Sequence, residues 1–169
     1  PHMKDHHAKV HFGRLRTLKG HQRPITDVHV SNDGKHLWTA SKDGLMFCWD
    51  QEQGTQEITY KGHNGAVFAM DVSSNEEYVA SAAADQKVIV WDSSSGVQLC
   101  EADNLGLLKD VVWSNDNKKV IACSRGFGKR PPVIYVFNLN KNNDDYNLEE
   151  ICKIELAAKP TQLFCCEDE

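Results

Sequence analysis

The stretch GHQRPITDVHVSNDGKHLWTASKDGLMFCWD, residues 20–50, returns in altered form as GHNGAVFAMDVSSNEEYVASAAADQKVIVWD, residues 62–92. The second copy begins 42 positions after the first, at residue 62 instead of residue 20, and the two align without a gap. Each copy opens with Gly-His, closes with Trp-Asp and carries an Asp seven positions before its end. An internal repeat of this length indicates a supersecondary unit that stacks against further copies of itself.

Each copy predicts four short β-strands joined by tight turns. Asp33-Gly34 lies between two apolar runs and is a strong hairpin signal, and Lys42-Asp43-Gly44 predicts a second hairpin. Runs such as residues 88–91 are apolar on both faces, which favours sheets packed between neighbours. The predicted strands are residues 25–30, 35–41, 45–49 and 56–60 in the first copy and residues 67–72, 78–83, 87–91 and 97–100 in the second.

The repeat length, the opening Gly-His and the closing Trp-Asp resemble the WD40 repeat, in which each copy forms one four-stranded blade of a β-propeller. The resemblance implies an all-β fold with about three and a half blades of a seven-bladed type, an incomplete ring. We therefore expect a fragment of a longer chain, whose open sheet edges favour association with another copy.

The resemblance also predicts how the chain is divided. Pro1 and His2 look like a cloning scar before Met3 and are left out of the fold. The expected parts are a flexible extension at 1–13, a ring-closing strand at 14–19, blade 1 at 20–60, blade 2 at 61–102, blade 3 at 103–157 and the start of blade 4 at 158–169, with its first strand at 161–166.

The third copy departs from the pattern. It lacks a Gly-His, and Phe137-Asn138 stands where the other copies have Trp-Asp, so we expect this blade to hold together by packing alone. Its insertion RGFGKRPP, residues 125–132, predicts an elongated solvated hairpin, with contact to protein or RNA as alternatives. The Asn- and Asp-rich run 138–150 predicts a long solvated loop. The strands expected here are residues 107–113, 118–124, 133–137 and 151–156.

The first two copies carry a His, a hydroxyl, an Asp and a Trp at matching offsets. Ser-His-Asp triads can be composed from them, but recurrence at a fixed period favours a structural role, because a catalytic site is needed only once. The resemblance implies a buried network in which these groups satisfy one another's hydrogen bonds. Ser41 is an alternative to Thr39, although the second copy has Ala83 at the matching position. The expected network residues are His21, Thr39, Asp43 and Trp49 in blade 1 and His63, Ser81, Asp85 and Trp91 in blade 2.

Composition narrows the function classes. The 169 residues, 40% of them hydrophobic, are enough for one sizeable core. A net charge of −5 argues against a protein that binds nucleic acid over its whole surface, and no direct DNA contact is expected. The sequence shows no apolar run long enough for a membrane span and no secretory leader. Six cysteines without C-x-x-C spacing, and no Asn-x-Ser/Thr, indicate a reducing compartment inside the cell.

No cofactor, metal or catalytic residue is expected. The sequence contains no Gly-x-Ser-x-Gly, no phosphate-binding loop and no zinc spacing. His2, His6, His7 and His11 could bind a metal adventitiously, but a polar, mobile terminus is the favoured interpretation.

Within the WD40 proteins, residues 20–28 (GHQRPITDV), 41–43 (SKD) and 62–68 (GHNGAVF) resemble subunit I of eukaryotic translation initiation factor 3, and so does the unusual third blade. The resemblance extends over about residues 15–165 and about half of that family's propeller. It departs from the family in the extension 3–14 and at Trp49-Asp50. It implies a non-catalytic scaffold in the cytoplasm that holds subunits of the B and G types. Through them the scaffold acts on the small ribosomal subunit as the pre-initiation complex assembles.

Two other hypotheses stay open. One is another intracellular WD40 adaptor, such as a kinase-receptor-associated signalling scaffold, although the insertion at 125–132 argues against it; the other is a propeller enzyme. Rigid blades present their connecting loops as a preformed surface. The candidate partner-binding residues on these loops are Arg23, Lys42, Gly65 and Arg125.

Overall fold

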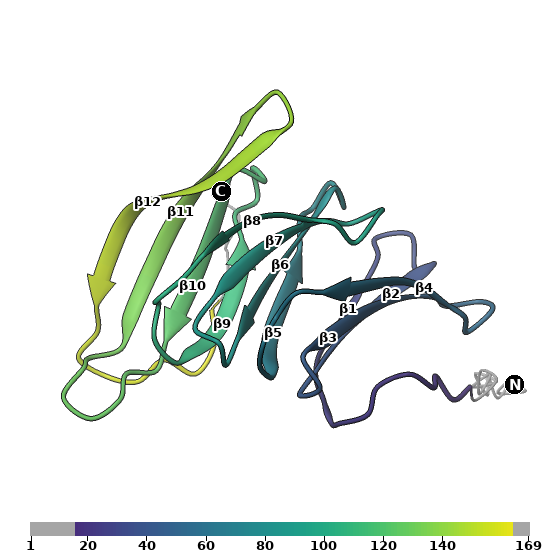
Figure 1. Ribbon diagram of the computed structural model, residues 1–169, viewed down its shortest axis with the longest axis horizontal. Helices are drawn as coiled ribbons and strands as arrows, with labels where there is room; N and C mark the ends of the chain where they lie inside the picture. Colours follow the sequence, from purple (N-terminus) through teal and green to yellow (C-terminus); the bar gives the residue numbers. More distant parts are fainter. Residues whose placement is uncertain (1–15, 164–169) are drawn as a thin grey trace, which may run out of the picture.

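The computed structural model describes residues 16–163, which form three four-stranded antiparallel sheets in chain order. Figure 1 shows the sheets side by side in an arc, with blade 1 nearest the N-terminus and blade 3 at the far end. Within each sheet every strand pairs with the strand that follows it in the chain. The all-β prediction of stacked propeller blades in an open ring is confirmed.

The strands fall close to their predicted positions. Blade 1 contains β1 (Ile25–Val30), β2 (His36–Ser41), β3 (Leu45–Asp50) and β4 (Gln56–Lys61). Blade 2 contains β5 (Val67–Val72), β6 (Tyr78–Ala83), β7 (Val88–Asp92) and β8 (Gln98–Ala102). Blade 3 contains β9 (Leu108–Trp113), β10 (Lys119–Ser124), β11 (Val133–Asn142) and β12 (Asp145–Glu155).

Two apolar layers between the sheets hold the arc together. The layer between blades 1 and 2 places Trp38 and Tyr60 of blade 1 against residues of blade 2 such as Ile89. The indole N–H of Trp38 donates to the Tyr60 hydroxyl at 2.9 Å, and that hydroxyl donates to the Ser93 carbonyl of blade 2 at 2.6 Å. The layer between blades 2 and 3 is more purely apolar and includes Val90 and Leu108. Burial of both sheet faces accounts for the runs that are apolar throughout.

The turns between the first and second strands of successive blades also bond to one another. The backbone N–H of Asn32 in blade 1 donates to the Glu76 side chain of blade 2 at 2.6 Å. The backbone N–H of Ser74 in blade 2 donates to the Asn117 side chain of blade 3 at 2.7 Å. These contacts fix the spacing of the blades at the edge opposite the loops described below.

The prediction of a solvated loop at 138–150 is wrong. Strands β11 and β12 continue through this run and close in a two-residue turn at Asn143 and Asp144, with Asn143 at φ 57°. Leu139, Tyr146 and Leu148 pack against the apolar layer between blades 2 and 3, while the polar residues between them face outward. The period-2 alternation of a half-buried strand was therefore present, but the Asn and Asp content concealed it.

The two predicted terminal strands are not formed in the described residues. Residues 16–19 of the expected ring-closing strand run without strand structure, and Arg14 and Leu15 lie outside the described residues. Residues 161–163 of the expected first strand of blade 4 are likewise irregular, and 164–166 lie outside. A strand needs a ladder partner, and none of the described residues supplies one at either place.

Candidate functional site

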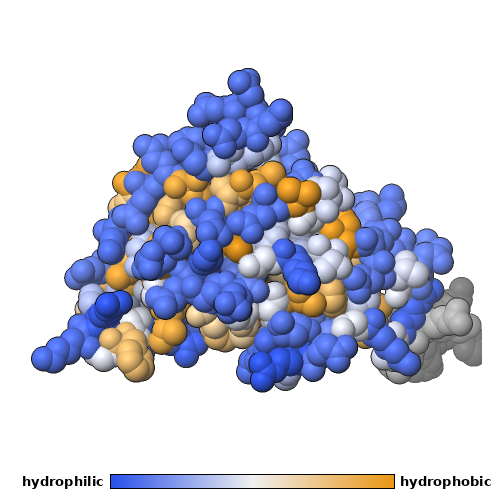
Figure 2. Space-filling view, in the orientation of Figure 1, coloured by the Kyte–Doolittle hydropathy of each residue, from blue (hydrophilic) through white to orange (hydrophobic). Residues whose placement is uncertain are grey.

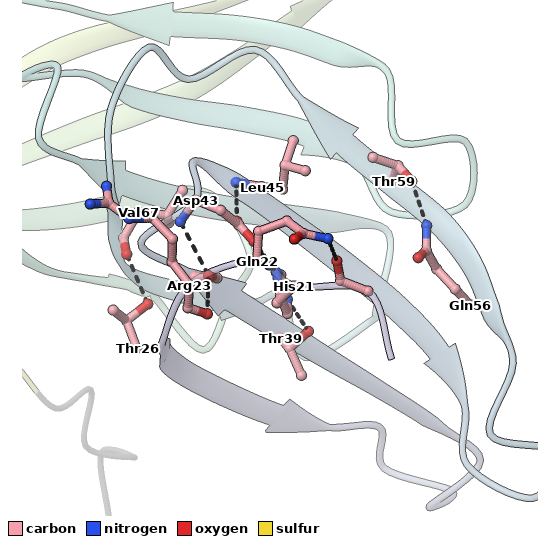
Figure 3. A network of polar contacts seen from close by, with 12 residues as sticks. His21, Gln22, Arg23, Thr26, Thr39, Asp43, Leu45, Gln56, Thr59 and Val67 are labelled. Carbon is pink, nitrogen blue, oxygen red and sulfur yellow. Dashed lines mark hydrogen bonds and ion pairs between the residues drawn. The ribbon is translucent and has the colours of Figure 1, made fainter. Parts of the chain in front are cut away.

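The four polar side chains of blade 1 meet in one network, and Figure 3 shows the part formed by His21, Thr39 and Asp43. The imidazole of His21 bonds through Nδ1 to Asp43 Oδ2 at 2.9 Å and through Nε2 to Thr39 Oγ1 at 2.8 Å. The indole N–H of Trp49 donates to the same Thr39 hydroxyl at 2.8 Å. Asp43 also accepts from the backbone N–H of Gln22 at 2.9 Å and of Leu45 at 3.0 Å. The network therefore joins the chain before β1 to strands β2 and β3.

Blade 2 repeats this network nearly atom for atom. His63 bonds to Asp85 Oδ2 at 2.9 Å and to Ser81 Oγ at 2.7 Å, and Trp91 Nε1 donates to Ser81 Oγ at 2.8 Å. Asp85 accepts from the backbone N–H groups of Asn64 and Lys87. The structure thus brings together all eight predicted network residues, in two sets. Ser41, the alternative to Thr39, instead donates to the Arg23 carbonyl at 3.0 Å.

In blade 2 the electrostatics favour an ionised Asp85 beside a neutral His63. Burial pushes the pKa of Asp85 upward, but hydrogen bonds from His63 and the Asn64 N–H outweigh it, and the pKa lies below its ordinary value. The pKa of Asp43 is lowered by the same balance, with the N–H groups of Gln22 and Leu45 opposing burial. Burial lowers the pKa of His63, since its bonds to Asp85 compensate only in part. With Nδ1–H donated to the Asp, His Nε2 accepts the proton of the hydroxyl.

This connectivity, hydroxyl to His to Asp, is the order found in a catalytic triad. The burial of the hydroxyl groups distinguishes these networks from a catalytic triad. The Ser81 side chain is fully buried and Thr39 is 2% exposed, although Thr39, His21 and Trp49 line an opening of about 410 Å³ beside the chain before β1. Each hydroxyl is further occupied by the indole N–H of a buried Trp. The arrangement satisfies buried polar groups and joins strands, and each hydroxyl is already engaged by a His and a Trp.

In blade 3 apolar residues stand at the places of the network. The pairing of β10 with β11 sets Val120 opposite Phe137, just as Val79 lies opposite Trp91 in blade 2, so Phe137 replaces the Trp. By the same register Ala122 replaces the hydroxyl residue. Blade 3 thus replaces hydrogen bonds with apolar packing.

The predicted partner-binding residues lie on the loops at one edge of the arc, which we call the lower rim. It comprises residues 20–24, 42–44, 62–66, 84–87, 103–107 and 125–132 (Figure 1). The backbone N–H of Lys42 donates to the Pro24 carbonyl at 3.0 Å, which sets Lys42 beside the exposed Arg23. The carbonyl oxygen of Gly65 lies 3.0 Å from where a Cβ at Gly44 would stand, so blades 1 and 2 meet tightly here. Arg125 lies apart on blade 3, where its N–H donates to the Leu107 carbonyl.

Sequence reasoning missed a second set of carboxylates, on the inner strands. Asp27, Asp71 and Asp110 each accept the N–H of the next residue through Oδ1. Through Oδ2 they accept an N–H from the following stretch of chain, namely those of Met70 at 2.9 Å, Trp113 at 2.7 Å and Leu163 at 2.8 Å. Burial raises the pKa of Asp71 and of Asp110. The three Asp residues do not share one repeat offset, so a search at a spacing of 42 does not find them.

The part of the chain that the structure describes gives little support for a metal site, a membrane span or a reactive cysteine. No group of three or more His, Cys, Asp or Glu side chains between residues 16 and 163 is placed to hold a metal ion. The same residues contain no helix long and apolar enough to span a membrane. Cys48, Cys100 and Cys123 are buried free thiols, and burial raises the pKa of the first two to about 12.

Comparison with known proteins identifies the repeat. The family model for the WD domain, G-beta repeat, matches residues 12–50 and 54–92, the two blades that carry the polar networks. The chain contains two WD40 repeats. WD40 domains typically serve as non-catalytic scaffolds for protein–protein interaction. Blade 3 lies outside the matched residues, as its apolar replacements lead one to expect.

The relatives of this WD40 chain are distant. It is 40% identical over 43 residues to actin-interacting protein 1 of Drosophila melanogaster, which is 25% of this chain and 7% of that protein. It is 37% identical over 49 residues to the guanine nucleotide-binding protein subunit beta of Saccharomyces cerevisiae, which is 29% of this chain and 12% of that protein. The chain thus matches only a small part of either relative.

Solved structures share the fold. The alignment to a chain of the mitotic checkpoint complex crystal structure has a TM-score of 0.71 at 19% identity and covers 88% of this chain and 44% of that one. The alignment to the structure of U3-55K has a TM-score of 0.68 at 21% identity and covers 85% and 43%. The WD40 chain therefore spans less than half the length of these neighbours.

Proposed function

We propose that this WD40 chain is a scaffold that recognises partner proteins with the loops of its lower rim and does no chemistry of its own. The observation that carries the proposal is the burial of both His-hydroxyl-Asp sets. Side chains of the types found in catalytic triads are here hydrogen-bonded to one another and hold the strands of each blade together. The rim loops expose side chains such as Lys42, Asn64 and Arg125 and rest on paired strands. Binding to such loops avoids much of the cost of ordering them.

The more specific proposal is a subunit I type scaffold of eukaryotic translation initiation factor 3, working in the cytoplasm. Its support is the resemblance of residues 20–28, 41–43 and 62–68, together with a third blade that lacks the Gly-His and the Trp-Asp. On this proposal the partners are initiation-factor subunits of the B and G types, and the small ribosomal subunit is reached through them. The candidate contacts are Arg23, Lys42, Gly65 and Arg125.

The test is a pull-down from lysate, read by mass spectrometry, with the wild-type chain and an Arg23→Glu/Lys42→Glu variant. Both side chains are exposed, so the exchange reverses charge on the rim without touching the core. We expect the wild type to recover initiation-factor subunits and the variant to lose most of them. Recovery of a complex that lacks initiation-factor and ribosomal proteins would exclude the specific proposal and leave the general one.

The alternative is an adaptor of another complex, such as a kinase-receptor-associated signalling scaffold. The similarity to a guanine nucleotide-binding protein subunit beta over 49 residues favours it. The same pull-down separates the two, because signalling proteins in place of translation factors would decide for the alternative.

We also propose that the chain self-associates through the ends of the arc. Three apolar residues of β1 are about half exposed, namely Ile25, Val28 and Val30, and so are Ile151 and Ile154 of β12. Unpaired strand edges and exposed apolar faces favour pairing with a second copy. Light scattering coupled to size exclusion tests this, and a monomer at high concentration would contradict it.

A further inference from the structure

A cavity of about 770 Å³ opens at the lower rim between blades 2 and 3. We call it the rim groove. Its sides come from three places: the turn at Gln86, the connection 104–107, and the hairpin 125–132 with the adjoining parts of β11 and β12. At the junction between blades 1 and 2, by contrast, the backbone of Gly65 packs closely on the turns at Gly44 and Asp85. The extra length of the blade 3 hairpin therefore coincides with the wider opening.

The walls of the rim groove are built by backbone bonds. The N–H of Leu105 donates to the Gln86 carbonyl at 3.1 Å, which fixes the connection to the turn of blade 2. Phe127 and Arg130 exchange two backbone bonds, at 3.2 and 3.0 Å, and so close the hairpin tip. Gly126 has φ 66°, and a Cβ there would lie 2.7 Å from the Arg130 carbonyl oxygen, so this turn requires glycine.

An aromatic side chain stands free at this tip. Phe127 is 77% exposed, the largest exposure among the large hydrophobic residues that the structure describes. It lines the rim groove together with the half-exposed Leu107 and the buried Tyr135. In Figure 2 the corner at lower left, where Figure 1 places the hairpin between β10 and β11, sets a hydrophobic group beside strongly hydrophilic ones. An exposed aromatic on a stiff hairpin is the kind of group that anchors a binding partner.

The charge around the rim groove is positive on a chain whose net charge is −5. Arg130 and Lys153 line the cavity, and Lys153 Nζ lies 5.4 Å from the centre of the Tyr135 ring. Arg125 and Lys129 flank them on a hairpin without an acidic residue. None of these four cations forms an ion pair within residues 16–163, and Glu155 is the one acidic residue of the lining.

We propose that the rim groove binds a short acidic peptide segment of a partner protein, with an aromatic or aliphatic side chain packed between Phe127, Leu107 and Tyr135. Carboxylates beside this anchor would meet Arg130 and Lys153, and the guanidinium can hold a carboxylate through two hydrogen bonds. The proposal rests on the scaffold function and names the partner's chemistry. It places recognition at blade 3, away from Arg23 and Lys42.

A peptide fits these features better than RNA. The rim groove is lined by side chains such as Leu107, Val133 and Tyr135, and Phe127 is its one strongly exposed aromatic. Single-stranded RNA is instead bound on successive stacking platforms along a basic track. Glu155 in the lining and the net charge of −5 act on either ligand alike, so this difference in the lining decides between them.

The experiment is a selection from a display library of random linear peptides on the immobilised chain, with counter-selection on the Phe127→Ser/Arg130→Glu variant. We expect the enriched peptides to carry two or more Asp or Glu residues around one Phe, Trp or Leu. In fluorescence anisotropy a labelled enriched peptide should bind the wild type and lose about tenfold or more in affinity to either single variant.

Two matched variants serve as controls. Lys118→Glu makes the same charge reversal in an exposed turn of blade 3 outside the rim groove, and Val97→Ser removes another exposed apolar side chain, on blade 2. Both should bind the peptide like the wild type. No enrichment, neutral or basic enriched peptides, or binding that survives Phe127→Ser and Arg130→Glu would overturn the proposal. Tighter binding of labelled oligouridylate, lost in the same variants, would assign the rim groove to RNA instead.

These outcomes are separable from the pull-down. If Arg23→Glu/Lys42→Glu abolishes partner capture while the peptide still binds, the rim groove stands and acts on a different segment. If no partner protein is recovered at all, the scaffold proposal fails, whether or not a selected peptide binds.

Discussion

Blades 1 and 2 and blade 3 reach the same four-stranded geometry by different chemistry. In the first two, a His, a hydroxyl, an Asp and a Trp satisfy one another in a buried network. In blade 3 Ala122 and Phe137 stand at the places of the hydroxyl residue and the Trp, and both are buried with no polar group to satisfy. The comparison shows that alternating strands and tight turns are common to all three blades. Their interiors are filled in two ways, by the polar network in blades 1 and 2 and by apolar side chains in blade 3.

The polar interiors of blades 1 and 2 and the apolar interior of blade 3 should respond differently to substitutions. A buried network is favourable only when every member is present, because each missing partner leaves a desolvated group unsatisfied. An apolar interior loses only the contacts of the atoms removed. Substitutions at matched positions should therefore cost more in blades 1 and 2 than in blade 3.

The largest effect is expected for Asp85→Ala. The carboxylate accepts from His63 and from the backbone N–H groups of Asn64 and Lys87, and its side chain is 9% exposed. Its removal leaves three donors unsatisfied and should lower the free energy of unfolding by about 3 kcal/mol or more. Urea denaturation followed by Trp fluorescence measures this. A change below about 1 kcal/mol would show that the network contributes little.

A reciprocal pair sharpens the comparison. Ser81→Ala removes the hydroxyl that bonds both His63 and Trp91, and we expect a loss of about 2 kcal/mol. Ala122→Ser introduces a hydroxyl at the matching place in blade 3, where we expect a loss of about 1 kcal/mol. Equal unfolding midpoints for the two variants in urea would contradict the distinction between the blades.

Much of the fold was predictable because its signals are local. Turn residues such as Asp33-Gly34 and the apolar runs gave β1, β5 and β6 their observed bounds and most other strands within one or two residues. The 42-residue repeat also singled out the eight network residues that the structure brings together. Features that recur at a fixed spacing are the easiest to see in one sequence.

The wrong predictions and the features that were not predicted concern residues that do not recur at the 42-residue repeat spacing. The extended β11–β12 hairpin was hidden by a run of Asn and Asp, although Leu139, Tyr146 and Leu148 alternate toward the core. The inner Asp residues bond to amides of the following stretch of chain, and which amide lies opposite depends on how the blades are rotated against each other. The rim groove depends on the spacing of two blades and the course of one hairpin, which composition does not determine.

Acid should affect the polar blades first. His63 has a lowered pKa, so its contribution is complete above about pH 6.5, the ordinary pKa, and is lost as the pH falls through the folded-state value. Asp43 and Asp85 also have lowered pKa values, and their contribution is lost below about pH 3.8. Asp71 and Asp110, with raised pKa values, oppose this decline near their own titration.

Hydrogen exchange can resolve this acid effect by blade. From pH 7 to pH 5, after correction for intrinsic rates, protection of β6 should fall more than protection of β10, because blade 3 lacks the titrating network. Equal loss in both strands would mean that acid acts on the whole chain and not through His63.

A smaller effect is expected at the inner strands. Asp27→Ala removes the acceptor for the N–H groups of Val28 and Met70, and the free energy of unfolding should fall by about 1 kcal/mol. Because the bond joins blade 1 to blade 2, amide exchange should rise at Met70 and stay unchanged at Trp113, whose acceptor is Asp71. Unchanged exchange at Met70 would show that apolar packing alone fixes the two blades.

The smallest effect on stability is expected for Phe127→Ser. The ring is 77% exposed, and the backbone bonds between Phe127 and Arg130 do not involve it, so the unfolding midpoint should stay within about 0.5 kcal/mol of the wild type. The same substitution is expected to weaken peptide binding strongly, so blade 3 would carry function at a position that contributes almost nothing to folding. Asp85→Ala is the converse case in blade 2, where a large stability cost falls on a residue with no exposed role. A large loss of stability in Phe127→Ser would mean that the ring packs against the blade. Blade 3 would then no longer differ from blade 2 in having a binding residue that is separate from its stabilising residues.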